Sequence, residues 1–140
     1  MAQAQSTTSL PSADETTRPA ATPLLRAFQV FSALAVLTVL YQFVTAGQLL
    51  PQGGPGNLHA GGAIVLHVFS ALAAVAAVLL WRRGQSSRGL AVLAVVVFVA
   101  TFVQAAIGGY DSLYVHIPGA MLLTAGVVWL LLASLRNSVR

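Results

Sequence analysis

The chain has 140 residues, of which 57% are hydrophobic and only 7% are charged. Its mean hydropathy is +0.82, whereas soluble domains carry about 25% charged residues. This composition excludes a disordered chain, a nucleic-acid-binding domain and a soluble enzyme with an ordinary surface, because too few charges remain to cover a water-facing globule. Cysteine is absent from the sequence, which excludes disulfide bonds and thiolate metal sites.

Residues 1–25 form a polar segment that is rich in Ser, Thr, Ala and Pro and has no apolar periodicity. We expect a disordered N-terminal tail there. The remaining domain, residues 26–136, contains four apolar segments that lack Asp, Glu, Lys and Arg and have the length of a membrane-spanning helix, about 20 residues. These segments are residues 27–48, 58–81, 89–109 and 113–135.

The connections between the apolar segments are short. Residues 49–57 contain two prolines and three glycines, residues 82–88 form a polar turn, and residues 110–112 leave room only for a tight turn. Short links make consecutive helices antiparallel neighbours. The sequence therefore predicts an all-α membrane protein, an antiparallel bundle of four transmembrane helices.

All seven basic residues are arginines, and all of them fall on one side of this predicted bundle. Cytoplasmic loops of membrane proteins carry the excess of Lys and Arg, so both termini and the loop at 82–88 are predicted to be cytoplasmic. The same asymmetry explains the isoelectric point near 10.8 without a nucleic-acid partner. The arginines are Arg18, Arg26, Arg82, Arg83, Arg88, Arg136 and Arg140.

Three histidines are the candidate functional residues, and all of them belong to the opposite, outer half of the bundle. A short internal echo relates two of them: Leu58–Ala63 and Val115–Ala120 both read apolar-His-x-x-Gly-Ala. This echo suggests a pseudo-repeat of two helical hairpins, an arrangement known in membrane bundles. The pseudo-repeat would place His59 and His116 at equal depth, facing each other.

Two opposed imidazoles are suited to hold a flat metallocofactor, since haem iron takes axial histidine ligands. We therefore expect His59 and His116 to be the metal ligands of one haem b. Gly62 and Gly119 lack side chains and are predicted to leave room beside the ring. His67 lies about 12 Å deeper than His59. It is an alternative ligand, a hydrogen-bonded core residue or a proton-relay group, with the core role favoured.

Polar side chains in the first and third helices have two possible roles. Gln104, together with Gln42, Thr45 and Thr101, is predicted to form hydrogen bonds between helices. The alternative is a polar wall that contacts a haem propionate or a quinone headgroup. Asp111 is expected to cap the fourth helix, or else to hold the second nitrogen of a histidine.

The segment from Leu40 to Leu135 carries a pattern of four positions: His59 and His67 in the second helix, Gln104 in the third, and His116-x-Pro-x-Ala in the fourth. With this pattern the chain resembles a family of small, functionally uncharacterised four-helix bacterial membrane proteins. It is also similar to one half of haem A synthase, in which a four-helix half-bundle holds haem between a histidine in helix 2 and one in helix 4. The resemblance implies a bacterial cytoplasmic membrane and a haem between His59 and His116.

The chain departs from the synthase in several respects. No acidic residue precedes His59, no arginine follows it, the first outer loop lacks a cysteine pair, and a second half is missing. Synthase activity is therefore not implied, and the sequence contains no hydrolytic triad, phosphate-binding loop or paired carboxylates.

Three functions are compatible with the sequence. The first is a small haem-binding bundle for electron transfer or haem handling, working with a membrane redox partner or a quinone. The second is a cofactor-free structural or assembly subunit of a membrane complex. The third and weakest is a transport element with His67 in a polar path. The sequence gives no indication of the oligomeric state.

Overall fold

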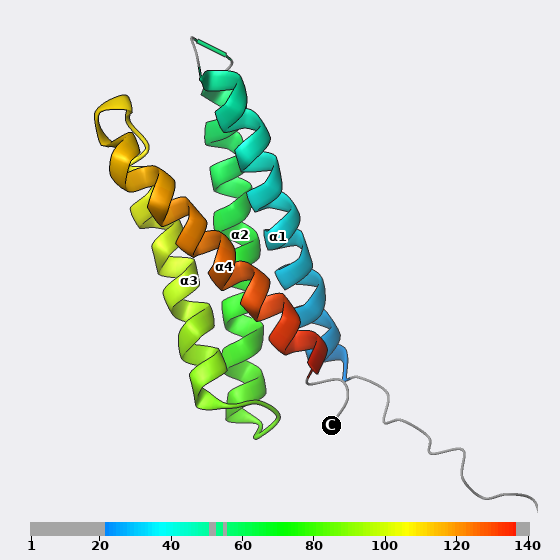
Figure 1. Ribbon diagram of the computed structural model, residues 1–140. Helices are drawn as coiled ribbons and strands as arrows, with labels where there is room; N and C mark the ends of the chain where they lie inside the picture. Colours follow the sequence, from blue (N-terminus) through cyan, green and yellow to red (C-terminus); the bar gives the residue numbers. More distant parts are fainter. Residues whose placement is uncertain (1–21, 51–52, 55, 137–140) are drawn as a thin grey trace, which may run out of the picture.

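The computed structural model describes residues 22–50, 53–54 and 56–136, and these residues form four long α-helices and no strand (Figure 1). This confirms the predicted all-α four-helix fold. Residues 1–21 of the predicted tail lie outside the described part of the chain. The helices are α1 (Pro23–Leu49), α2 (Gly56–Arg82), α3 (Arg88–Ala106) and α4 (Leu113–Arg136), with a 3-10 turn, η1 (Tyr110–Ser112), before α4.

Local capping sets the helix boundaries. Helix α1 begins at Pro23, four residues before the expected start, so the end of the predicted tail is helical. The reason is that Thr22 Oγ1 accepts a hydrogen bond from Leu25 N at 3.2 Å, which caps the helix just before a proline that suits its first turn. Ser87 caps α3 in the same way, through Leu90 N at 3.2 Å.

Helix α2 ends in a glycine turn. Gln85 N bonds to Leu80 O at 2.9 Å, and Gly84 N bonds to Trp81 O at 2.9 Å. Gly84 has a φ of +69°, the left-handed conformation that this pair of bonds requires and that glycine adopts without strain. The chain therefore reverses sharply between α2 and α3.

The two ends of the bundle differ in chemistry. The α2–α3 turn, the start of α1 and the end of α4 lie at one end (Figure 1), and a hydrogen bond from Gln29 Nε2 to Ser134 O joins α1 to α4 there at 3.2 Å. We call it the arginine end, because all arginines of the described residues lie there: Arg26, Arg82, Arg83, Arg88 and Arg136. The opposite end, which carries His59 and His116, is called the histidine end.

The core combines alanines with leucine, valine and phenylalanine side chains, and large apolar side chains also cover the surface. Helix α2 buries four alanines, which allows the neighbouring backbones to approach closely, as helices do in lipid. Leucine, valine and aromatic side chains cover the outside, including Leu122, which is 76% exposed. All four helices are long and apolar enough to cross a membrane, so the chain is a multi-pass membrane protein. The buried alanines are Ala73, Ala74, Ala76 and Ala77.

Buried positions recur with the same spacing in all four helices, as on the contact face of any packed helix, so the pseudo-repeat stays a prediction. In the second helix of each hairpin, Leu66, Ser70, Ala73 and Ala77 match Leu123, Val127, Leu130 and Ser134. In the first helix of each hairpin, Phe28, Ser32, Ala35 and Val39 match Leu90, Ala94, Val97 and Thr101. His59 and His116 precede Leu66 and Leu123 by the same interval, so they hold equivalent places.

Candidate functional site

His59 of α2 and His116 of α4 form a ring pair at the histidine end. Their ring centres are 6.5 Å apart, and the ring planes are inclined at 68°, an edge-to-face arrangement. Both side chains are half-buried. The structure thus brings together the two histidines that the sequence pattern selects.

A threonine of α1 holds the His59 ring. Thr45 Oγ1 lies 3.0 Å from His59 Nδ1 and 3.1 Å from Gln42 O. The hydroxyl also lies 3.2 Å from Tyr41 O, and when it donates to one of these two carbonyls of its own helix it accepts from His59 Nδ1–H. The His59 ring then carries its hydrogen on Nδ1 and keeps the lone pair of Nε2 available.

A backbone carbonyl of α3 holds the His116 ring. His116 Nδ1 lies 3.1 Å from Gln104 O. This carbonyl lies in the last turn of α3, which ends at Ala106, so it has no partner within the helix. A carbonyl only accepts, and the proton of His116 is therefore also on Nδ1. The hydrogen bonds described for the two rings thus run through Nδ1.

Gln42 and Gln104 cover the two glycines, Gly62 and Gly119, that follow His59 and His116 by three residues. A Cβ atom added to Gly62 would meet Gln42 Oε1, and one added to Gly119 would meet Gln104 Nε2. The space that the sequence pattern assigned to a cofactor ring therefore holds amide side chains. A planar group between the histidines would border Gln42 and Gln104 and not the bare glycine backbone.

One atom of this glutamine pair lacks a partner. Gln104 Oε1 is buried, and it makes no hydrogen bond to any residue in the part of the chain that the structure describes. A buried acceptor without a donor costs about 1–3 kcal/mol. Within the described part of the chain, the Gln104 side chain therefore does not make the predicted interhelical hydrogen bond.

His67 lies apart from this pair, in contact with α3. Its Nδ1 is 2.8 Å from Thr101 Oγ1, and Thr101 in turn donates to Phe98 O at 2.6 Å. The ring stacks on Phe102 with centres 4.2 Å apart. Thr101 therefore forms the interhelical hydrogen bond that was predicted for it, and His67 has the contacts of a core residue. It makes no ring contact with His59 or His116.

Some partners in the site were not predicted. The residue type of Gln104 does not indicate that its backbone oxygen binds His116. This contact depends on where α3 ends. Asp111, which was expected to cap α4 or to hold a histidine, makes no side-chain hydrogen bond within the described ranges; Gln104 O takes the place proposed for it beside His116.

The donor set limits the kind of metal group that fits. No cluster of three or more His, Cys, Asp or Glu side chains lies among residues 22–50, 53–54 and 56–136. Two imidazoles alone do not fill the coordination sphere of a bare transition-metal ion. They do suit a metal that already carries equatorial ligands of its own, and haem iron has this property.

Searches against protein-family models, curated proteins and solved structures find no match to this chain. The resemblance to the synthase half and to the small bacterial family therefore stays a prediction.

Proposed function

We propose that this membrane protein binds one b-type haem between His59 and His116 and serves in electron transfer or haem handling. The observation that carries the proposal is the pair of histidine rings, whose centres lie 6.5 Å apart and which are each held through Nδ1. Two imidazoles that share one metal, with nitrogen–metal distances of about 2.0–2.1 Å each, have ring centres roughly 6.3 Å apart. The observed separation agrees with this value.

The surroundings of the two rings support the same role. In metal sites the ligating histidine donates its other ring hydrogen to a carbonyl or another oxygen, which fixes the tautomer and makes the ligand more basic. Thr45 Oγ1 serves His59 in this way, and Gln104 O serves His116. These two contacts support the Nδ1–H tautomer in which Nε2 of each ring could serve as a metal ligand.

When bound, the haem supplies one-electron redox chemistry, and the protein supplies its axial ligands and an apolar setting. The histidine pair lies toward one end of α2 and α4, helices of 27 and 24 residues. A single haem there does not carry an electron across the whole bilayer, so electron transfer would require a membrane redox partner or a quinone. Under the positive-inside rule this site would lie on the outer side of the membrane, which the resemblance implies is a bacterial cytoplasmic membrane.

A reduced-minus-oxidised optical spectrum tests the proposal. Protein purified from a haem-replete host is expected to show sharp bands of a haem with two histidine ligands, in a ratio near one haem per chain. Haem-free protein after expression with excess haem precursor, and no haem uptake on titration, would contradict it.

The alternative is a cofactor-free subunit, and the same ring pair provides its support. Edge-to-face rings with centres about 4.5–7 Å apart also pack favourably without any ligand. In that case the histidines join the two hairpins, and the spectrum above stays flat while their replacement lowers only the stability.

A further inference from the structure

The second hairpin, α3 and α4, is loosely packed at the histidine end. Residues 103–122 comprise the last turn of α3, η1 and the first turns of α4, and none of them is buried. The nearest buried residues on either side are Thr101 and Leu123. The first hairpin differs, because it buries Thr45 and Gly62 at the same end. Few apolar contacts therefore hold residues 103–122, which we call the flap, and such segments open at low cost in free energy.

From this difference between the hairpins we infer that the flap opens away from α1 and α2 and admits the ligand that His59 and His116 share. Figure 1 shows the α3–α4 turn lying apart from the ends of α1 and α2. The two histidines face each other across this opening, one on each hairpin. The identity of the ligand as haem rests on the proposed function, whereas the movement of the flap does not.

Among the described residues, one hydrogen bond joins the flap to the first hairpin. Tyr110 Oη donates to Leu49 O at 3.3 Å. Leu49 is the last residue of α1, so its carbonyl has no donor within the helix. The Tyr110 side chain is 68% exposed, and water replaces an exposed hydrogen bond at little cost. Tyr110 therefore acts as a latch that closes the flap without fixing it.

The base of the flap is the level at which contacts with α2 begin. Thr101 Oγ1 lies 2.8 Å from His67 Nδ1, and Phe102 stacks on the same ring with centres 4.2 Å apart. On α4, Pro118 lies inside the helix, where it has no N–H to bond to the carbonyl four residues earlier. The α4 part of the flap therefore bends more easily than an unbroken helix.

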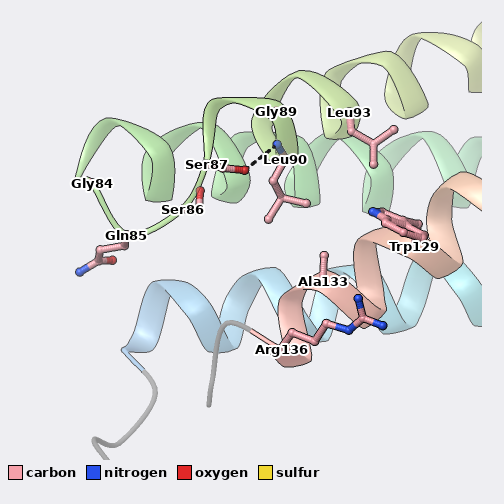
Figure 2. Close-up of a pocket in the computed structure, with 10 residues that line it drawn as sticks. All are labelled: Gly84, Gln85, Ser86, Ser87, Gly89, Leu90, Leu93, Trp129, Ala133 and Arg136. Atoms are coloured by element: carbon pink, nitrogen blue, oxygen red, sulfur yellow. Dashed lines mark hydrogen bonds between the residues drawn. The ribbon is translucent and has the colours of Figure 1, made fainter. Parts of the chain in front are cut away.

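The arginine end of the same hairpin is fixed. Leu90 of α3 and Ser134 of α4 are buried there, and Ser134 O accepts a hydrogen bond from Gln29 of α1. Figure 2 shows this end, with Leu90 of α3 on one side and Ala133 of α4 on the other. We therefore expect the flap to move while the arginine end stays in place.

Distances between spin labels test the movement without any haem. The chain has no cysteine, so labelled cysteines can be introduced at exposed positions. In haem-free protein in bilayer nanodiscs, double electron–electron resonance between Val44→Cys on α1 and Tyr114→Cys on the flap, the flap pair, is expected to show a closed and an open component. Val92→Cys on α3 and Leu132→Cys on α4 are the control pair at the arginine end, and we expect one narrow component for it.

The latch and the ligand entry are tested with one variant. Tyr110→Phe keeps the ring but removes the hydroxyl, so the open component of the flap pair is expected to increase. The association and dissociation rates of haem should both rise by a similar factor of about 2–10, the range for one hydrogen bond, and leave the affinity unchanged. Tyr114→Phe is the control, because this hydroxyl is on the flap but bonds to no described residue. Stopped-flow absorbance measures the rates.

Three results would contradict parts of this inference or of the proposed function. One narrow component for the flap pair, unchanged by Tyr110→Phe, would show that the flap does not open. Equal haem rates in Tyr110→Phe and the unchanged protein, despite a larger open component, would show that the ligand enters elsewhere. Absence of haem binding in a protein whose flap opens would overturn the proposed function and leave the movement established.

Discussion

The imidazole rings of His59 and His116 meet edge to face with centres 6.5 Å apart, although they lie on different helical hairpins. Each ring is anchored through Nδ1 to the helix that precedes its own: His59 to Thr45 of α1, and His116 to Gln104 O of α3. The two histidines therefore have equivalent settings and should be equally necessary for any group that they share.

Replacement of either histidine is the first prediction. His59→Ala and His116→Ala are each expected to abolish the two-histidine haem spectrum, because one axial ligand is lost. His67→Ala is the matched control, since its ring is held by Thr101 and Phe102 and does not contact the pair. If the spectrum were lost in His67→Ala but kept in His59→Ala, the ligand would be His67 and not His59.

The hydrogen bond to His59 provides the second prediction. Thr45→Val keeps the shape of the side chain but removes the acceptor for His59 Nδ1–H, and we expect haem affinity to fall by about 10–100-fold. Thr38→Val on the same helix is the control, because the Thr38 hydroxyl bonds only to Leu34 O, at 2.8 Å. Titration of the haem-free proteins with haem measures both affinities, and equal affinities would rule out a role for Thr45.

Close packing between α3 and α4 leads to the third prediction. A Cβ atom on Gly126 would lie 2.8 Å from Val97 Cγ2, whereas one on Gly61 has no neighbour within 4 Å. Gly126→Ala is therefore expected to lower the free energy of unfolding by about 1–3 kcal/mol. Gly61→Ala should leave it unchanged or raise it, because alanine favours the helix. Denaturant unfolding in detergent micelles, followed by circular dichroism, compares the two.

The orientation in the membrane is the fourth prediction. The sequence has no cysteine, so single cysteines can be introduced without a background signal. A membrane-impermeant maleimide added to intact cells is expected to label Tyr110→Cys at the histidine end. Gln85→Cys at the arginine end should react only after the membrane is permeabilised. The reverse pattern would place the histidine pair in the cytoplasmic half.

The fold was predictable because it depends on composition. Four uncharged segments separated by turn residues leave few arrangements in lipid, and the structure has all four helices close to their predicted bounds. The differences arise from local hydrogen bonds: Thr22 starts α1 early, and α3 ends at Ala106 instead of residue 109. A difference of one turn at a helix end lies within what pattern reasoning leaves open.

The site was predictable only in part. The repeated His-x-x-Gly-Ala spacing indicated that His59 and His116 would share a depth, and the structure pairs them. The spacing could not indicate that Gln42 and Gln104 would cover Gly62 and Gly119, because this contact depends on how the neighbouring helices are rotated. The partner of His116 depends on where α3 loses its helical hydrogen bonds, which residue types do not reveal.

The pairing of matched buried positions across the two hairpins has a consequence for assembly. In the proposed haem site each hairpin provides one histidine, so we expect neither half of the protein to retain haem when produced alone. Two co-expressed fragments, divided in the α2–α3 turn, should show haem absorption only when they reassociate in the bilayer. The haem absorption would then measure the reassembly of the two hairpins.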